Sequence, residues 1–429
     1  MKNKNLLSIH LNEFDYKYLI YGSKKYKLKN LKELLSFNKI KTYTNDKVQN
    51  ENLDPWVQCV SINTGRKTSI HKISELNQKI PNNIDQIWDV LSKKKIKCGV
   101  WGPMNALYRQ NKFLEFFFPD PWNFNSKLYP KKLKKYFNLP NYYAQNYADV
   151  NKLNFIFLCI RFLFNILYTR NINFFLKNFN FFFRLILNKG LKNYILFFIL
   201  DIISLNIFLD LVEKKKTNFS HIFFNSLAHF QHNNWNEIKF EKDYFELTDK
   251  LIEIFLNFTK KRNLSIIIYN GFTQKKEVKY LLRPKNPALF LKKIGINFYK
   301  LEQDMTHGGI IYFNSIVDRD RSLKILKNFN VFKLNFFETK ILSNTRIFYR
   351  IKINSKIIFT NKTKNINKYL FSDKKKNIFK KKNSFKNNKF FFKYIDFIKS
   401  TGIHSGEGVL FYNFVSQKKI KNKKIHNTQ

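Results

Sequence analysis

The residues best suited to chemistry lie in one N-terminal stretch and in histidine-bearing segments far downstream. The stretch, residues 54–71 (DPWVQCVSINTGRKTSIH), combines several hydroxyl side chains with a Thr64-Gly65 break and His71. A threonine hydroxyl becomes a nucleophile when an adjacent base or metal removes its proton, so Thr64 and His71 are candidate catalytic residues. A structural interpretation stays open for both, because threonine also caps turns and histidine also serves as a buried polar residue.

Imidazoles occur at two further places where they could act together. His229 and His232 are three residues apart, a spacing that can place both on one helix face. His404 lies in the Gly-rich turn of GIHSGEGVLF, just before an apolar strand. Imidazole suits zinc, and carboxylates suit harder divalent cations. A hydrogen-bonded polar cluster is the alternative for the pair, and an ordinary turn residue is the alternative for His404.

The elements that must position these residues can be read from apolar periodicity. Residues 6–11, 96–101 and 264–269 predict buried strands, and residues 84–91 predict a helix. Strand, helix, strand in this order predicts a parallel βαβ unit. Asn12 and Glu13 follow the first strand, at the carboxyl edge where open α/β sheets bind ligands. A plain strand-end turn is the alternative, and Gln58 and Asn105 could line a polar pocket.

The order of these parts resembles the alkaline phosphatase superfamily, which includes phosphodiesterases and sulfatase-like hydrolases. The segment around His404 is similar to the last histidine segment of that superfamily, and SINTGRKTSIH is similar to its Thr-Gly…His-Gly landmark. Asn225-Ser-Leu-Ala-His229 and Asn12-Glu13 resemble segments in which the superfamily carries aspartate. The resemblance implies an α/β fold, an alkaline-phosphatase-like sandwich with a central, mostly parallel sheet flanked by helices, plus an inserted helical cap.

The same resemblance implies a site at the sheet edge. Its metal ligands would come from Asn12, Glu13, His229, His232 and His404. Because amides stand where carboxylates are expected, we expect one divalent ion (Zn, Mn, Mg or Ca) rather than two, or none. Thr64 and His71 would be catalytic, although Asp54-Pro55-Trp56 occupies the usual place of the nucleophile without a hydroxyl. Substrate contacts would come from Gln58, Asn105, Asn225, Asn270 and His307, and His307 with Asp304 is an alternative ligand pair.

Two functions follow from this reading. The first is hydrolysis of small anionic phosphate (phosphodiester) or sulfate esters at an altered, single-metal site. The second is a non-catalytic relative that binds an anionic ligand or a partner, which the missing nucleophile and the amides favour. Whether the chain is an enzyme stays open at this point. No GxxxxGK[ST] loop, GxGxxG fingerprint or HExxH helix occurs, which excludes P-loop, dinucleotide-binding and common zinc-protease classes.

Composition predicts how the chain is organised. We expect residues 1–150 and 216–350 to form the α/β core, 151–215 an inserted apolar helical cap, 351–395 a low-complexity basic segment, and 396–429 a C-terminal core strand with a basic tail. Residues 154–212 are the most apolar part, but charged residues interrupt every window long enough to span a membrane. We therefore expect packed helices there, with membrane-surface contact as the alternative.

The formal net charge of +48 does not by itself indicate a nucleic-acid partner. Lysine, asparagine, isoleucine and phenylalanine are abundant together, as A/T-rich codons produce, whereas arginine, which reads phosphate and bases, is scarce. Three cysteines without a CxxC pair argue against a disulfide framework. With a short, interrupted N-terminal apolar patch, these features predict a cytoplasmic protein, with membrane association as an alternative.

Overall fold

The computed structural model describes residues 5–44, 53–124, 126–147, 150–167, 172–190, 192–235, 238–305, 308–331, 334–352, 393–414 and 425–426. The chain divides into two compact units. The first comprises Met1–Tyr142, Leu153–Glu277 and Thr401–Gln429, and the second comprises Tyr143–Lys152 and Val278–Ser400. The sequence indicated no boundary near Val278. The low-complexity segment predicted at 351–395 lies almost entirely outside the described residues.

The first unit is built on an eight-stranded sheet in the order β16-β2-β15-β6-β1-β5-β3-β4. Its central strands β6, β1, β5, β3 and β4 are all parallel, and β15 pairs antiparallel with both β6 and β2. The predicted α/β architecture with a mostly parallel sheet is therefore confirmed. The strands are β1 Leu6–Leu11, β2 Asn38–Tyr43, β3 Cys98–Trp101, β4 Leu114–Phe118, β5 Phe219–Phe224, β6 Ser265–Tyr269, β15 Glu407–Tyr412 and β16 Ile425–His426.

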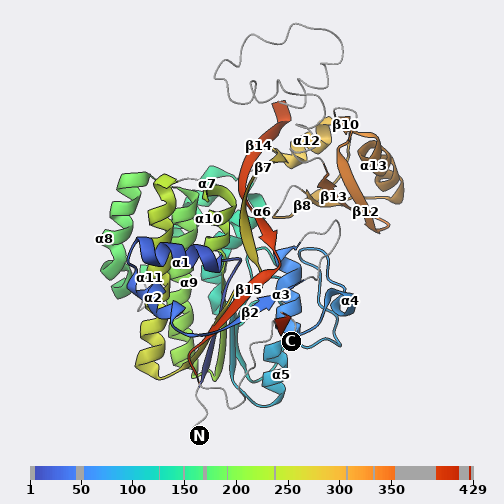
Figure 1. Ribbon diagram of the computed structural model, residues 1–429. Helices are drawn as coiled ribbons and strands as arrows, with labels where there is room; N and C mark the ends of the chain where they lie inside the picture. Colours follow the sequence, from blue (N-terminus) through green and yellow to red (C-terminus); the bar gives the residue numbers. More distant parts are fainter. Residues whose placement is uncertain are drawn as a thin grey trace. The chain divides into compact units, whose positions relative to one another are not determined.

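Helices cover both faces of this sheet (Figure 1). On one side lie α1 Tyr16–Lys25, α2 Lys29–Leu35, α9 Asn193–Lys215 and α11 Ile238–Arg262, and on the other α3 Pro55–Thr64, α4 Thr68–His71 and α5 Ile87–Lys93. The remaining helices of this part are α6 Lys134–Asn146, α7 Lys152–Leu167, α8 Ile172–Lys189 and α10 Ser226–Asn234, with a 3-10 turn at Lys131–Leu133.

The alternation of β1 explains why its two faces differ. Side chains of a strand point to opposite faces at every second residue. Leu7, Ile9 and Leu11 belong to the main hydrophobic core, whereas Ser8 and His10 point to the other face. Burial there is nearly complete, so the polar face is an interior and not a solvent surface.

The apolar region 154–212 forms helices, as its periodicity predicted. The longest, α9, is apolar and long enough to cross a membrane by length and composition, and it is the one such helix among the described residues. Its side chains nevertheless contribute to the main core: Phe208 contacts Phe116 of β4 edge to face, and Asp201 accepts a hydrogen bond from the Ser226 amide at the start of α10. The helix is therefore a packed layer of the α/β unit.

The second unit has its own core. A four-stranded antiparallel sheet in the order β12-β13-β9-β8 packs with two helices around buried residues such as Phe290 and Tyr349. The elements are α12 Pro287–Lys293, β8 Lys300–Gln303, β9 Gly308–Tyr312, α13 Ile316–Asn328, β12 Phe337–Ser343 and β13 Arg346–Ile351, with a short β10 Asn330–Val331 and β11 Leu334–Asn335 pair. A separate two-stranded sheet pairs β7 Thr273–Pro284 with β14 Ile395–Ser405.

Candidate metal centre

The site lies at the carboxyl edge of the parallel strands. β1 ends before Asn12-Glu13, β5 before Asn225 and β6 before Asn270. Because β1 pairs parallel with both β5 and β6, these residues are brought to one edge of the sheet. His232 reaches that edge from α10, and His404 reaches it from β14.

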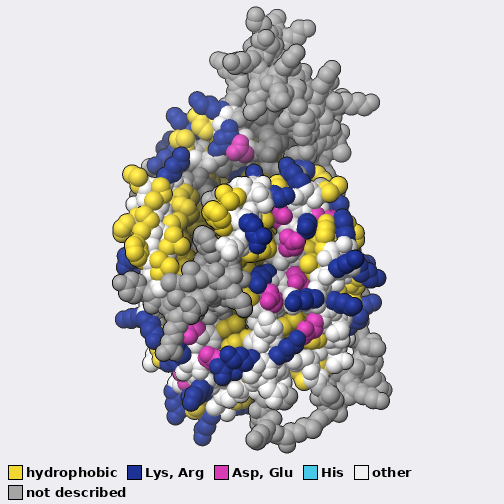
Figure 2. All heavy atoms as spheres, turned by 90° about the vertical axis from the view of Figure 1, so that its left-hand side faces the viewer, with side chains coloured by type: hydrophobic (Ala, Val, Ile, Leu, Met, Phe, Trp, Pro, Cys, Tyr) yellow, Lys and Arg dark blue, Asp and Glu magenta, His cyan; other side chains and the backbone are white. Residues whose placement is uncertain are grey.

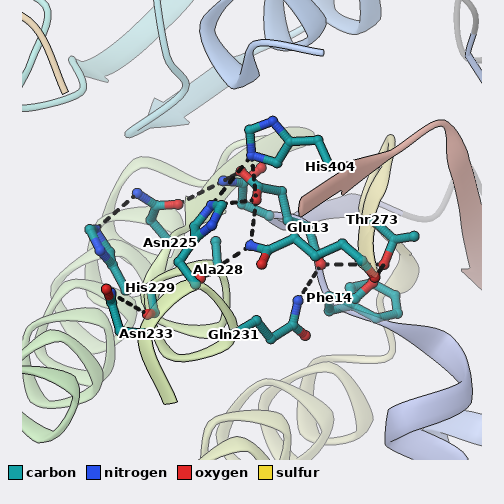
Figure 3. A network of polar contacts seen from close by, with 12 residues as sticks. Glu13, Phe14, Asn225, Ala228, His229, Gln231, Asn233, Thr273 and His404 are labelled. Atoms are coloured by element: carbon teal, nitrogen blue, oxygen red, sulfur yellow. Dashed lines mark hydrogen bonds and ion pairs between the residues drawn. The ribbon is translucent and has the colours of Figure 1, made fainter. Parts of the chain in front are cut away.

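Three side chains converge there from segments far apart in the sequence. Glu13 Oε2 lies 3.1 Å from His232 Nε2 and 3.2 Å from His404 Nε2. The two imidazole Nε2 atoms are 3.3 Å apart. Figure 3 shows His404 directed at the Glu13 carboxylate. Glu13 is buried, while the side chains of His232 and His404 are 31% and 23% exposed, so the group opens toward solvent on its histidine side.

The triangle formed by these atoms fits a divalent ion. Ligand atoms around a tetrahedral zinc at bond lengths of about 2.0–2.1 Å are separated by roughly 3.3 Å. The three separations between Glu13, His232 and His404 match that spacing. Two imidazoles and a carboxylate are also the donor set of catalytic zinc sites that keep a fourth position open. Asn12 Oδ1 is buried and has no partner among the described residues, so one more oxygen is available nearby.

Neighbouring amides hold the Glu13 carboxylate in place, and the two histidines favour its ionised form. Asn12 Nδ2 donates to Oε1 at 2.9 Å, and Gln274 Nε2 donates to Oε2 at 2.6 Å. Burial alone would raise the pKa of Glu13, but His404 and His232, through their charges and hydrogen bonds, outweigh it and leave the pKa well below its usual range. The backbone of Glu13 has a φ of 56°, a left-handed conformation that is uncommon outside glycine.

His229, predicted as a ligand, has a different neighbourhood. Its ring stacks on Phe197 with centroids 4.0 Å apart and planes 1° apart. Its Nε2 faces the Asn225 side-chain amide at 3.4 Å, and Figure 3 shows Asn225 between His229 and Glu13. Asn225 also accepts a 2.7 Å hydrogen bond from Asn12. His229 is therefore outside the convergent group, joined to it through two amides.

Thr64 and His71, predicted as catalytic, make local structural contacts. Thr64 Oγ1 donates to the Val60 carbonyl at 2.7 Å, a bond that closes the last turn of α3. His71 is fully buried, and its Nδ1 accepts a hydrogen bond from the Ile73 amide at 3.0 Å. Its Nε2 then carries the proton and lies 2.9 Å from Ser61 Oγ. These contacts support the structural interpretation of both residues.

The amides predicted to bind substrate mostly fix loops. Asn105 accepts from the Asn77 amide and donates to the Glu75 carbonyl. Asn270 donates to the Phe14 carbonyl at 2.8 Å and accepts from the Val409 amide at 2.9 Å, which ties β6 to β15.

Of the other predicted substrate contacts, Gln58 is buried within α3, and His307 lies outside the described residues. Asp304, its proposed companion, belongs to the second unit. Asn225 is connected to the convergent group through Asn12.

Sequence reasoning missed two glutamines that support the site. Gln274 lies in β7 within a polar, lysine-rich run that carries no motif, and Gln231 lies in α10 one residue before His232. Gln231 Nε2 donates to the Glu13 carbonyl at 2.8 Å, and its Oε1 accepts from the Asp15 amide and the Tyr244 hydroxyl. The loop after β1 is thereby fastened to α10. The position of Gln231 beside a candidate ligand was the one available signal.

Comparison with known proteins gives a likeness of fold alone. No protein-family model matches the chain, and no curated protein matches it. Among solved structures, phosphonoacetate hydrolase from Sinorhizobium meliloti 1021 is 9% identical, with 99% of this chain and 94% of that chain covered and a TM-score of 0.41. Human ectonucleotide pyrophosphatase/phosphodiesterase 5 is also 9% identical, covering 99% of this chain and 92% of that chain at a TM-score of 0.44.

Alkaline phosphatase from the Antarctic bacterium TAB5 is 14% identical over 65% of this chain and 83% of its own, with a TM-score of 0.35. These proteins come from the superfamily that the sequence motifs resemble, and what they share with this chain is a likeness of fold at low identity. At such low identities and TM-scores they identify no activity for this chain.

Proposed function

We propose that the protein is a hydrolase of small anionic phosphate or sulfate esters that works with one divalent ion. The observation that carries the proposal is the triangle of Glu13 Oε2, His232 Nε2 and His404 Nε2 at the sheet edge. A bound ion of this kind would polarise the ester oxygen and lower the pKa of water. Zn, Mn, Mg and Ca are all divalent candidates, and the two imidazoles favour zinc among them.

The residues of the chain then have defined tasks. Glu13, His232 and His404 would hold the ion, and Asn12 and Gln274 would hold Glu13 in place through its two carboxylate oxygens. The first turn of α3 begins Pro55-Trp56 after Asp54 and offers no hydroxyl. The site therefore supports direct attack by water, in place of a covalent intermediate on a threonine or serine.

The net charge of the chain supports an anionic substrate. With a formal charge of +48, the protein attracts anions from solution, and the attraction weakens as salt screens it. We expect KM for an aryl phosphodiester to rise with ionic strength while kcat changes little, because the long-range field acts on encounter and not on the bound state.

The decisive experiment combines metal analysis with turnover. Purified protein is expected to hold close to one equivalent of a divalent metal and to hydrolyse an aryl phosphodiester, an aryl phosphomonoester or an aryl sulfate. His404→Ala is expected to lose both the metal and the turnover. His229→Ala is the matched control, because that ring stacks on Phe197 outside the group, and it should retain the metal.

A second candidate function is non-catalytic binding of an anionic ligand at the same edge. The observation that favours it is the set of amides, Asn12, Asn225 and Gln274, that stand around Glu13 in place of further carboxylates. Stoichiometric metal without turnover of any of the three ester classes would support this candidate over the hydrolase. Protein that binds neither metal nor aryl esters would contradict the hydrolase proposal.

A further inference from the structure

The helix α7 presents a continuous apolar face to the outside of the first unit. Seven large apolar side chains on it are between 50% and 80% exposed: Leu153, Ile156, Phe157, Ile160, Leu163, Phe164 and Leu167. Their spacing of three and four residues places them on one stripe of the helix. The opposite side of the helix buries Phe162 and Ile166 in the main core. The helix is therefore anchored by one apolar face and leaves a second one uncovered.

The next helix along the chain repeats this arrangement. α8 buries Phe182 in the same core and leaves Phe183 and Leu187 48% and 66% exposed. Figure 2 views the molecule from the side on which α8 lies, and it shows hydrophobic side chains gathered there with Lys and Arg side chains around them. Single exposed apolar residues are ordinary, but a contiguous set of this size marks an interaction surface.

The charge around these helices indicates what covers them. Residues 151–200 contain no Asp or Glu, and they carry seven cations: Lys152, Arg161, Arg170, Lys177, Arg184, Lys189 and Lys192. Arg161 is exposed and lies one residue after Ile160, about 100° round the helix, at the edge of the apolar stripe. Lys189 pairs with Asp243 of α11 at 3.7 Å, whereas Lys152, Arg161, Arg184 and Lys192 are exposed. An apolar stripe with exposed cations beside it complements an anionic lipid surface.

A second copy of the chain is a poorer occupant. Each copy has a formal charge of +48, so two copies repel one another as they approach. An anionic bilayer instead attracts each Lys or Arg that is held near its surface. The length of α7, 16 residues, is below the roughly 20 that a membrane span needs, so the helix would lie in the plane of the interface.

We propose that the exposed apolar face of α7, with Phe183 and Leu187 of α8, is a docking surface for anionic lipid membranes. The side chains of α7 enter the boundary between headgroups and acyl chains, and the surrounding cations contact the lipid phosphates. This proposal is independent of the metal centre, because none of the docking-surface residues belongs to the group formed by Glu13, His232 and His404.

The test uses the full-length protein and vesicle sedimentation. One vesicle is made of equal parts phosphatidylcholine and phosphatidylserine, and the other of phosphatidylcholine alone. Wild type is expected to bind the anionic vesicle, more weakly at high salt. The triple variant Phe157→Gln/Ile160→Gln/Phe164→Gln keeps the charge and removes apolar area, so its partition coefficient should fall by at least about tenfold.

The matched control is Val317→Gln/Ile341→Gln, which removes two apolar side chains of the second unit that are 72% and 48% exposed. It should bind like wild type, and thermal melting should show that both variants are folded. If the triple variant were unstable, Phe157→Gln alone should show a smaller loss in the same direction.

Two results would overturn the proposal. The first is a triple variant that binds anionic vesicles as wild type does, which would assign the binding to charge alone. The second is a wild-type protein that binds neither vesicle. Sedimentation velocity would then show whether the face joins two copies, as a dimer that the triple variant converts to a monomer.

Discussion

Four histidines of the first unit lie in two contrasting environments. His232 and His404 lie at the rim of the sheet, partly exposed, with their Nε2 atoms beside the Glu13 carboxylate. His10 and His221 project from β1 and β5 into the buried polar face, where both are essentially inaccessible to solvent. The first pair shares an acidic partner, and the second pair is held by neutral groups.

The buried pair shows what happens without a carboxylate in contact. His10 Nε2 lies 3.1 Å from the Asn270 carbonyl, and His221 Nδ1 lies 3.1 Å from Ser8 Oγ. Burial lowers the pKa of His10 to about 4 and that of His221 to about 3, so both are neutral near pH 7. Their other nitrogens, Nδ1 of His10 and Nε2 of His221, have no partner among the described residues.

The comparison shows that position relative to Glu13, and not residue type, separates a candidate ligand from a core residue. His221 instead stacks on the Trp88 and Tyr269 rings, at centroid distances of 5.8 Å and 6.4 Å. Its role is therefore that of an aromatic core side chain with one polar contact. The predictions below test this separation, beginning with the largest expected effect.

Removing the Glu13 carboxylate should abolish metal binding at the sheet edge. Glu13→Gln keeps the size of the side chain but replaces the anionic ligand with a neutral amide, so we expect metal affinity to fall by more than about 100-fold, with turnover lost. Metal titration by calorimetry measures the change. His221→Phe, at the buried face, should leave metal affinity as it is, and a similar loss in both variants would contradict the comparison.

The buried pair should make the fold sensitive to acid. The folded-state pKa of each ring lies below the ordinary 6.5, so the unfolded chain binds more protons between about pH 6.5 and pH 4. The contribution of this pair to the free energy of unfolding should therefore fall on acidification through this window, by about 1.4 kcal/mol per pH unit for each histidine, and the buried Asp120 carboxyl group acts in the opposite direction. Urea unfolding at several pH values measures the slope.

Two variants test whether the buried histidines cause this pH dependence of the free energy of unfolding. His221→Phe removes one titrating ring while keeping its aromatic packing, so its slope should be shallower than that of wild type. His229→Phe replaces a half-buried ring at the site edge and should leave the slope nearly intact. Equal slopes in wild type and His221→Phe would show that the acid sensitivity arises elsewhere.

A hydrogen bond that holds the Glu13 side chain in place can be removed without changing a metal ligand. Gln274→Leu removes the donor that lies 2.6 Å from Glu13 Oε2, and loss of such outer contacts commonly costs 10–100-fold in metal affinity. We expect a loss in that range, measured by competition with a chelator. Native metal affinity in Gln274→Leu would remove Gln274 from the site.

Asp120 is a second buried carboxyl group, and its pKa is shifted in the opposite direction to that of Glu13. Burial raises the pKa of Asp120 to about 7, opposed by the hydrogen bond from the Trp122 amide. The folded state then binds more protons than the unfolded chain between about pH 4 and pH 7, so Asp120 lowers stability as pH rises through that range. Asp120→Asn should raise the free energy of unfolding at pH 8 by about 1–2 kcal/mol, with little change at pH 4. A variant less stable than wild type at pH 8 would contradict this assignment.

Much of the fold could be predicted from local pattern. β1 spans Leu6–Leu11 as predicted, and β6 and α5 lie within a few residues of their predicted positions, because apolar residues at strand and helix spacing bury one face. The division of the chain into a second unit could not be predicted, because the strands of that unit alternate weakly and its boundary at Val278 falls inside β7. No composition change marks that boundary.

The candidate site was predicted in part. Glu13, His232 and His404 were identified from residue type and order, and they converge. Thr64 and His71 were identified in the same way, yet their side chains complete α3 and α4. A hydroxyl or an imidazole near a turn has the same local sequence whether it faces a pocket or its own helix, so the motif could not separate these cases.

The sequence by itself determined that strands would end in polar residues at one sheet edge and that imidazoles were available to join them. Only the tertiary structure decided that His232 faces Glu13 while His229, three residues earlier on the same helix, stacks on Phe197. The spacing of three residues fixes which side of α10 carries the two rings. The neighbours that each ring meets come from β1, α9 and β14, and these elements lie far away along the chain.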